Sequence, residues 1–175
     1  MKDIVFKHAP ILENEYSYEN LITFAKKLKK KIPSLDWFIR AFENIGWSDH
    51  FDLYAGKKNK ERVQIVLEIV EKYIAQTTQI NVFTIEHILP DSMSILNSQI
   101  GNLIPLERKI NENCATEALV EKIEKYKKSQ FASTRGFAER FSSQEFKPEN
   151  RTKYLARLIF NNILELNQTD FSDDE

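Results

Sequence analysis

The stretch Thr84–Cys114 reads TIEHILPDSMSILNSQIGNLIPLERKINENC, and it departs from the rest of the chain. The whole chain has only three histidines and four glycines, yet this window contains His87, Gly101 and several asparagines. INVFTIE is rich in β-branched and aromatic side chains and favours a short strand. GNLIPL predicts a second short strand, which Pro105 restricts to a sheet edge. Because ERKINENC predicts a short helix, the window as a whole predicts a β-hairpin followed by a helix.

The segments before the window have the apolar spacing of amphipathic helices. Ser17 and Ser34 are favourable N-caps for two helices that begin directly after them. WSDHFDLYAGKKNK, which begins at Trp47, predicts a loop. KERVQIVLEIVEKYIAQT carries the longest apolar stripe in the chain and predicts a long helix over residues 60–77.

Helical spacing resumes after the window. One or two helices are expected there, with a break near Gly136. Pro148 suits the first turn of a last helix. The expected fold class is therefore mostly α with a small embedded β-hairpin-and-helix unit, an α+β arrangement.

The composition is that of an ordinary soluble globular chain of 175 residues, with 42% hydrophobic and 29% charged residues. No apolar run approaches the length of a membrane span, and the first residues, MKDIVFKHAP, lack the apolar region of a secretory signal. The single cysteine, Cys114, has no partner for an internal disulfide and no neighbour for a structural zinc ion. These features predict a cytoplasmic protein without a membrane partner.

The net charge of −1 conceals an uneven distribution of charged side chains. Residues 100–160 contain 12 Lys or Arg against 8 Asp or Glu, whereas the last fifteen residues contain 5 Asp or Glu and no Lys or Arg. A mildly basic segment suits contact with a polyanion. Solvated helix faces and an acidic terminus would give the same counts, so charge alone leaves both interpretations open.

Glu86 and His87 stand side by side in the first predicted strand, and Asn111 lies on the predicted short helix. A lone histidine is more often structural than catalytic. Adjacent strand residues point to opposite faces, although at the end of a strand both can approach one ion. Carboxylate and amide oxygens suit Mg²⁺ or Mn²⁺, and a neutral imidazole beside them can act as a general base on water. Together these groups have the chemistry of metal-assisted phosphodiester hydrolysis.

The motifs EHILPD and GNLIPLERKIN resemble those of the HNH, or His-Me finger, endonucleases, whose ββα-metal unit holds one divalent ion. The version they resemble is the C-terminal nuclease domain of GmrSD-type restriction enzymes. That domain typically has an EHILPQ stretch, then GNL and an Asn, and further along a Lys and a Tyr, which correspond to Lys122 and Tyr126. The helices QIVLEIVEKY and NRTKYLARLI are similar to the flanking helices of that domain.

The resemblance implies a division of the chain into three parts. A GmrSD-type HNH nuclease domain would occupy residues 35–166, with its ββα-metal core at about 80–115. An N-terminal helical segment, 1–34, would precede this domain. An acidic disordered tail, 167–175, would follow it.

The resemblance also implies roles for individual residues. His87 matches the general base. Asn102 matches the family's middle asparagine, which ties the long loop and helps to hold the base, and we therefore count it with the catalytic residues. Glu86 and Asn111 match the ligands of one divalent ion, Mg²⁺ or Mn²⁺. Phosphate contacts with DNA are expected, by charge and location, from Arg108, Lys109 and Lys122.

Two positions depart from the family pattern. Asp91 stands where the family often has Gln, and we favour a loop carboxylate over a supplementary metal ligand there. Thr116, with Asn113 nearby, stands where another Asn is frequent. Neither departure removes the base or the two ligands.

The resemblance implies a metal-dependent endonuclease that cleaves DNA, in bacterial defence against modified phage DNA. Larger family members carry a nucleotide-hydrolysing, DNA-sensing domain, and this chain contains no GxxxxGK[ST] motif. A separate specificity protein or domain is therefore an expected partner. Two alternatives stay open: a catalytically inactive helical binding or regulatory module that retains the HNH scaffold, and cleavage of RNA in place of DNA.

Overall fold

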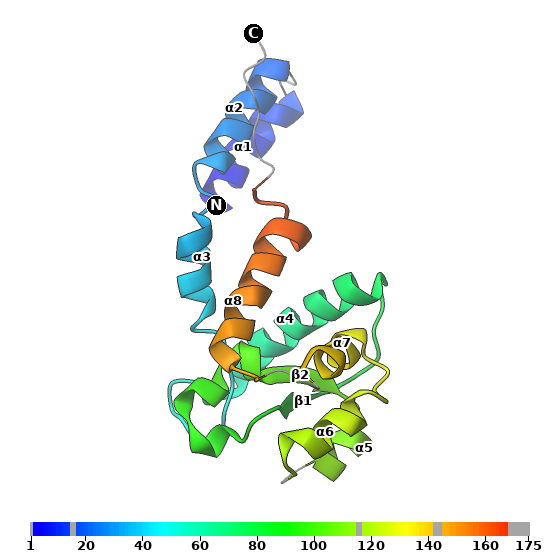
Figure 1. Cartoon of the computed structure of the whole chain (residues 1–175). Helices are drawn as coiled ribbons and strands as arrows, with labels where there is room; N and C mark the ends of the chain where they lie inside the picture. Colours follow the sequence, from blue (N-terminus) through cyan, green and yellow to red (C-terminus); the bar gives the residue numbers. More distant parts are fainter. Residues whose placement is uncertain (1, 15–16, 115–116, 142–144, 168–175) are drawn as a thin grey trace.

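The computed structural model describes residues 2–14, 17–114, 117–141 and 145–167, and within this part of the chain it is mostly helical (Figure 1). The predicted tail, apart from residue 167, and Thr116 lie outside the described residues. Before the hairpin there are four helices: α1 (Lys2–Asn14), α2 (Tyr18–Lys29), α3 (Leu35–Phe42) and α4 (Lys57–Ala75). The predicted N-caps are confirmed, because Ser17 Oγ accepts from Asn20 N at 3.1 Å and Ser34 Oγ accepts from Trp37 N at 3.3 Å.

The predicted hairpin is present. Strands β1 (Thr84–His87) and β2 (Leu103–Leu106) pair antiparallel, with Thr84 opposite Leu106 and His87 opposite Leu103. The connection between them contains three short 3₁₀ turns: η1 (Asp91–Met93), η2 (Ile95–Ser98) and η3 (Ile100–Asn102).

The helices after the hairpin are α5 (Arg108–Cys114), α6 (Leu119–Tyr126), α7 (Ala132–Phe141) and α8 (Pro148–Leu158), and α8 continues into the π-helical turn η4 (Ile159–Ile163). Pro148 occupies the first turn of its helix as predicted. The prediction of a break near Gly136 is wrong. The chain breaks between α6 and α7 around Ser129, and Gly136 lies inside α7, where an added Cβ would meet no atom within 4 Å.

The two faces of the hairpin pack against different helices. Ile85 and Leu103 face a core that contains side chains of α3, α4 and α8. Ile104 and Leu106 face a second core that contains side chains of α5, α6 and α7. Since side chains alternate along a strand, consecutive residues of β1 point to opposite faces of the hairpin. This alternation determines where the polar residues of β1 lie.

The start of β2 is attached firmly to α8. Gly101 N donates to Thr152 Oγ1 at 3.0 Å, and the Arg151 guanidinium donates to the carbonyls of Gly101 at 2.8 Å and Leu103 at 2.9 Å. Burial lowers the pKa of Arg151 to about 10. A Cβ at Gly101 would stand 2.0 Å from the Pro148 carbonyl oxygen, so this approach requires glycine.

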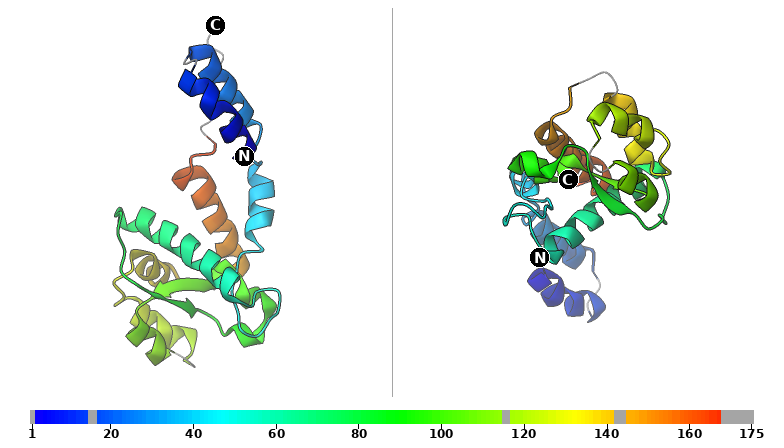
Figure 2. Two further views of the ribbon diagram at one scale, coloured as in Figure 1. Left: turned by 180° about the vertical axis from the view of Figure 1, so that it is seen from behind. Right: turned by 90° about the horizontal axis from the view of Figure 1, so that it is seen from below.

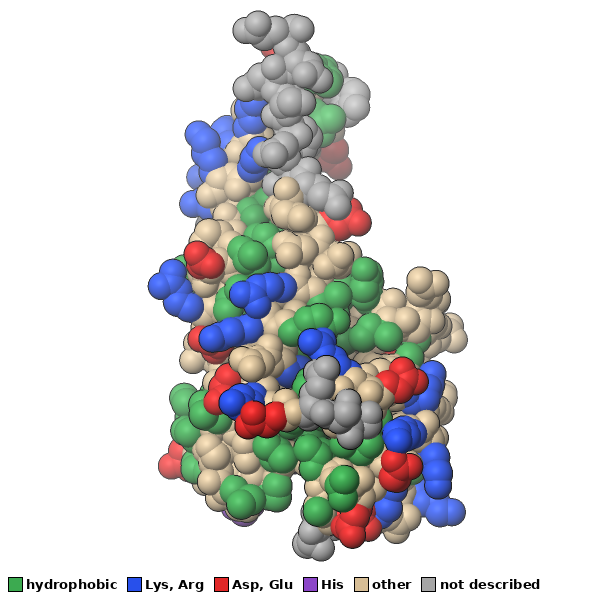
Figure 3. All heavy atoms as spheres, viewed as in Figure 1, with side chains coloured by type: hydrophobic (Ala, Val, Ile, Leu, Met, Phe, Trp, Pro, Cys, Tyr) green, Lys and Arg blue, Asp and Glu red, His purple; other side chains and the backbone are tan. Residues whose placement is uncertain are grey.

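Helices α1 and α2 form an arm that projects beyond α3 and α8 (Figures 1 and 2). Neither buried core draws a described residue from this arm. Basic side chains gather along its α2 side (Figure 3), where the last turn of α2 carries Lys26, Lys27 and Lys29. Within the described part of the chain, no helix has the length and apolar character that crossing a membrane requires.

Candidate functional site

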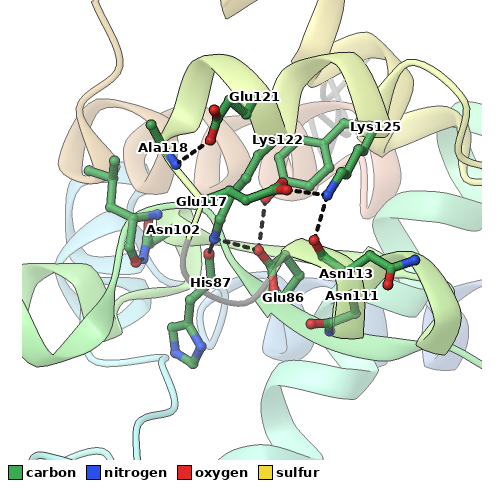
Figure 4. A network of polar contacts seen from close by, with 12 residues as sticks. Glu86, His87, Asn102, Asn111, Asn113, Glu117, Ala118, Glu121, Lys122 and Lys125 are labelled. Atoms are coloured by element: carbon green, nitrogen blue, oxygen red, sulfur yellow. Dashed lines mark hydrogen bonds and ion pairs between the residues drawn. The ribbon is translucent and has the colours of Figure 1, made fainter.

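Glu86 is buried on the face of β1 that meets α6. Its Oε1 accepts hydrogen bonds from Lys122 Nζ at 2.7 Å (Figure 4) and from Tyr126 OH at 2.9 Å. Lys122 and Tyr126 lie one turn apart on α6, so both reach the same face. Burial, followed by the Glu86 charge, raises the pKa of Tyr126, which keeps its hydroxyl protonated as a donor. Both bonds converge on one oxygen of the carboxylate.

Lys122 joins the two predicted site residues of β1. Its ammonium donates to Glu86 Oε1 and also to the His87 carbonyl oxygen at 2.9 Å. The side chain is only 3% exposed. A phosphate contact from Lys122, as expected from sequence, would therefore require the ammonium to leave Glu86. Arg108 and Lys109 are exposed at the start of α5, where a phosphate can reach them.

Asn111 is held against β1 by its amide nitrogen. Nδ2 donates to Thr84 Oγ1 at 2.9 Å and to the Ile85 carbonyl at 3.1 Å. A carbonyl only accepts, so the NH₂ group must face the strand and Oδ1 must point the other way. The structure thus brings Asn111 to the backbone of the residue that precedes Glu86.

His87 ends β1 and lies on the opposite face from Glu86. Its Nε2 is 2.9 Å from the Trp47 carbonyl oxygen, and its ring lies against the Trp47 indole, with centroids 5.3 Å apart. The ring turns away from the Glu86 carboxylate (Figure 4). The expected approach of both side chains to one point is not seen, because the alternation of β1 persists to its last residue.

The contact with Trp47 settles which nitrogen of His87 carries a proton. Because the Trp47 carbonyl can only accept, Nε2 must be the protonated nitrogen when the imidazole is neutral. The lone pair then belongs to Nδ1. The arrangement leaves Nδ1 as the atom that can accept a proton from water.

Asn102 holds the loop between the strands and is completely buried. Its Nδ2 donates to the carbonyls of Leu89 and Asn97, both at 2.7 Å, and its Oδ1 accepts from Leu89 N at 2.9 Å. These bonds occupy the carboxamide with loop backbone directly after His87. Through these bonds the Asn102 side chain ties together the backbone of the loop between the strands.

Asp91 lies on the His87 side of the hairpin. Its Oδ2 accepts from Ser48 Oγ at 2.7 Å and stands 3.8 Å from His87 Nε2, while its Oδ1 is 3.7 Å from His50 Nε2. Burial alone would raise the pKa of Asp91, but the Ser48 hydroxyl and the two histidines outweigh burial and lower it. Asp91 thus lies beside His87, on the face of the hairpin opposite Glu86.

Sequence reasoning placed Trp47, Ser48 and His50 in a plain loop and missed their contacts with the site. The four residues WSDH could have indicated a site, because they bring together indole, hydroxyl, carboxylate and imidazole side chains and include one of only three histidines in the chain. Their partners, His87 and Asp91, are about 40 residues away in sequence, so no local spacing relates them to the loop.

The donors around Glu86 fit a hard divalent ion. A carboxylate oxygen of Glu86 and Oδ1 of Asn111 are the oxygen ligands that Mg²⁺ and Mn²⁺ prefer. Among the described residues, no group of three or more His, Cys, Asp or Glu side chains could hold a metal ion. The Glu86 carboxylate and the Asn111 carboxamide are the groups beside β1 whose chemistry could hold such an ion.

Comparison with known families identifies the region that contains these residues. Residues 47–158 match the family model for the C-terminal domain of GmrSD restriction endonucleases. Comparisons with curated proteins and with solved structures give no match. The matched region covers more than half of the chain and contains every site residue described above, from Trp47 to Tyr126. The chain therefore belongs to the family of GmrSD restriction endonuclease C-terminal domains.

Proposed function

We propose that this chain is a divalent-metal-dependent endonuclease that hydrolyses DNA phosphodiester bonds through an HNH-type ββα unit formed by β1, β2 and α5. The observation that best supports this proposal is the contact of His87 Nε2 with the Trp47 carbonyl, which leaves Nδ1 as a proton acceptor at the end of β1. The family supports the same conclusion, since it consists of restriction endonuclease domains.

His87 is the general base in this proposal. Nδ1 removes a proton from a water molecule that attacks the phosphorus, and a base in such a position contributes about 10²–10⁴-fold to the rate. The Trp47 carbonyl holds the ring by accepting from Nε2, and the Asp91 carboxylate lies 3.8 Å from the same nitrogen. In-line attack places the base and the leaving oxygen on opposite sides of the phosphorus. The different directions of His87 and Glu86 suit this geometry.

Glu86 and Asn111 would hold one Mg²⁺ or Mn²⁺ through a carboxylate oxygen and Oδ1. The ion would stabilise negative charge on the phosphate and on the departing oxygen. Arg108 and Lys109 would contact neighbouring phosphates from the start of α5. The biological role we propose is bacterial defence against modified phage DNA, with a separate nucleotide-hydrolysing protein or domain supplying specificity.

One observation favours the alternative of an inactive binding or regulatory module. The carboxylate of Glu86 is already paired with Lys122, as in a purely structural buried ion pair. In such a module the polar residues of the hairpin would only hold the scaffold together. Metal binding separates the two proposals, since a scaffold has no reason to bind an ion at Glu86 and Asn111.

The test is a plasmid nicking assay with Mg²⁺ or Mn²⁺. We expect cleavage by the wild type, loss upon addition of EDTA, and a loss of about 10²–10⁴-fold in His87→Ala without loss of folding. An RNA substrate in the same assay separates DNase from RNase activity. Asn111→Ala is expected to weaken Mn²⁺ binding measured by calorimetry with a DNA duplex present. Wild-type protein that cuts no substrate and binds no ion, even with DNA present, would favour the inactive module.

A further inference from the structure

Lys122 cancels the charge of the one carboxylate in the proposed metal site. Glu86 and Lys122 are both buried, and their charged atoms are 2.7 Å apart. Asn111, the other proposed ligand, is neutral. Lys125, one turn further along α6, bonds instead to Glu117 and to the Asn113 carbonyl, so it does not add to the charge on Glu86 (Figure 4). The paired ligands thus have almost no net charge.

A divalent ion needs anionic oxygen to replace the water it loses. Affinity for such ions rises with the number of charged ligands. The Lys122 ammonium also repels a cation bound at Glu86, and this repulsion is strong because both groups are shielded from water. A free protein with this arrangement is a weak divalent-ion site. A phosphate that bridges the ion would bring the missing negative charge.

We propose that Lys122 neutralises Glu86 so that the site takes up its divalent ion only together with a nucleic-acid phosphate. The proposal rests on the endonuclease function proposed above and says how that function is regulated. Ion and substrate bind cooperatively, and the protein without DNA binds little metal. Lys122 is a positioning residue here, because it acts through Glu86 and its buried ammonium need not touch DNA.

Tyr126 offers a way to separate charge from hydrogen bonding. Its hydroxyl bonds to the same Glu86 oxygen as Lys122 does, but it is neutral. Tyr126→Phe therefore removes a hydrogen bond to Glu86 and leaves the charges unchanged. Lys125→Met is the matched control for loss of a lysine, because it removes an α6 ammonium that does not bond to Glu86.

The experiment measures Mn²⁺ binding by electron paramagnetic resonance. All proteins carry His87→Ala to prevent cleavage, and the protein with this substitution alone is called the parent. Each protein is measured without DNA and with a duplex oligonucleotide, at a duplex concentration that saturates the protein by fluorescence anisotropy. Mn²⁺ bound by the duplex alone is subtracted. A parallel Asn111→Ala protein reports whether the ion occupies the proposed site.

We expect the duplex to increase the Mn²⁺ affinity of the parent protein by at least about tenfold. Lys122→Met is expected to bind Mn²⁺ at least about tenfold more tightly without DNA, and to gain less from the duplex. Tyr126→Phe and Lys125→Met should keep the dependence on DNA shown by the parent. Mn²⁺ should also raise the melting temperature of Lys122→Met more than that of the parent, because an ion replaces the missing ammonium.

Equal Mn²⁺ affinity of the parent with and without duplex would overturn the proposal, as would weaker binding by Lys122→Met without DNA. The comparison of the parent with and without duplex decides the question even if Lys122→Met fails to fold. Either result leaves the endonuclease proposal standing, since an ion still binds. Absence of bound ion in every protein, with and without duplex, would instead overturn the metal-dependent function itself.

Discussion

One carboxamide satisfies three backbone groups in the loop that follows the proposed base. Asn102 bonds to Leu89 N, to the Leu89 carbonyl and to the Asn97 carbonyl, and no part of it reaches solvent. A buried backbone group that loses its partner costs about 1–3 kcal/mol. At the scale of single residues, Asn102 therefore contributes more to the stability of this loop than any single side chain within the loop does.

Asn102→Ala is expected to lower the free energy of unfolding by about 3 kcal/mol or more, because three backbone groups lose their partner together. Urea denaturation measures the change. Asn97→Ala is the matched control in the same loop: its side chain makes one described bond, from Nδ2 to the Pro90 carbonyl, and its loss should cost about 1 kcal/mol. Similar costs for the two variants would contradict the role assigned to Asn102.

The positions of the proposed site residues could be predicted from sequence better than their surroundings. Motifs single out Glu86, His87 and Asn111, and the structure places all three on or beside β1. The burial of Lys122 could not be predicted, because its charge suggested the surface and its partner lies 36 residues away. The contact of His87 with the Trp47 carbonyl could not be predicted from side-chain types, because every residue has a backbone carbonyl.

At the scale of elements, a carboxylate from one helix caps another. Glu71 is buried on α4, and its oxygens accept from Ala132 N at 2.7 Å, from Ser133 N at 2.9 Å and from the Ser133 hydroxyl. These donors lie in the first turn of α7, where a negative charge also favours the helix dipole. The contact fixes the start of α7 against the long helix α4.

Glu71→Gln is expected to lower the free energy of unfolding by about 2 kcal/mol, because a neutral amide presents one acceptor and turns an NH₂ group toward backbone donors. Glu68→Gln is the control on the same helix. Glu68 is paired with Lys72 at the surface, and loss of that pair should cost about 0.5 kcal/mol or less. Equal urea midpoints for Glu71→Gln and the wild type would show that the cap contributes little.

Element boundaries followed the sequence wherever a local chemical signal marks them. The N-caps Ser17 and Ser34 and the proline at Pro148 are such signals, and all three were confirmed. Gly136 misled because glycine lowers helix propensity without forbidding a helix, and the packing of Phe137 and Ala138 in the core outweighs that loss. The Glu71 cap could not be foreseen, because its donors lie about 60 residues further along the chain.

At the scale of the whole molecule, the arm and the rest of the chain differ in burial. Helix α3 contributes Ile39 and Phe42 to the core that also contains Leu67 of α4 and Leu155 of α8. Helix α2, in contrast, has no buried residue. The family match begins at Trp47, so the core extends to residues before the matched region. These observations suggest that the arm adds little to the stability of the rest.

Removal of residues 1–33, which leaves the Ser34 cap in place, should change the free energy of unfolding by no more than about 0.5 kcal/mol. Urea denaturation and the nicking rate measure the result. A second truncation that also removes α3 is the control: loss of Ile39 and Phe42 should cost several kcal/mol, about 2–5 for each large core side chain. If the first truncation is as damaging as the second, the arm packs as part of the core. If only the second is damaging, the folded unit begins at Ser34, thirteen residues before the family match, because the core needs the side chains of α3.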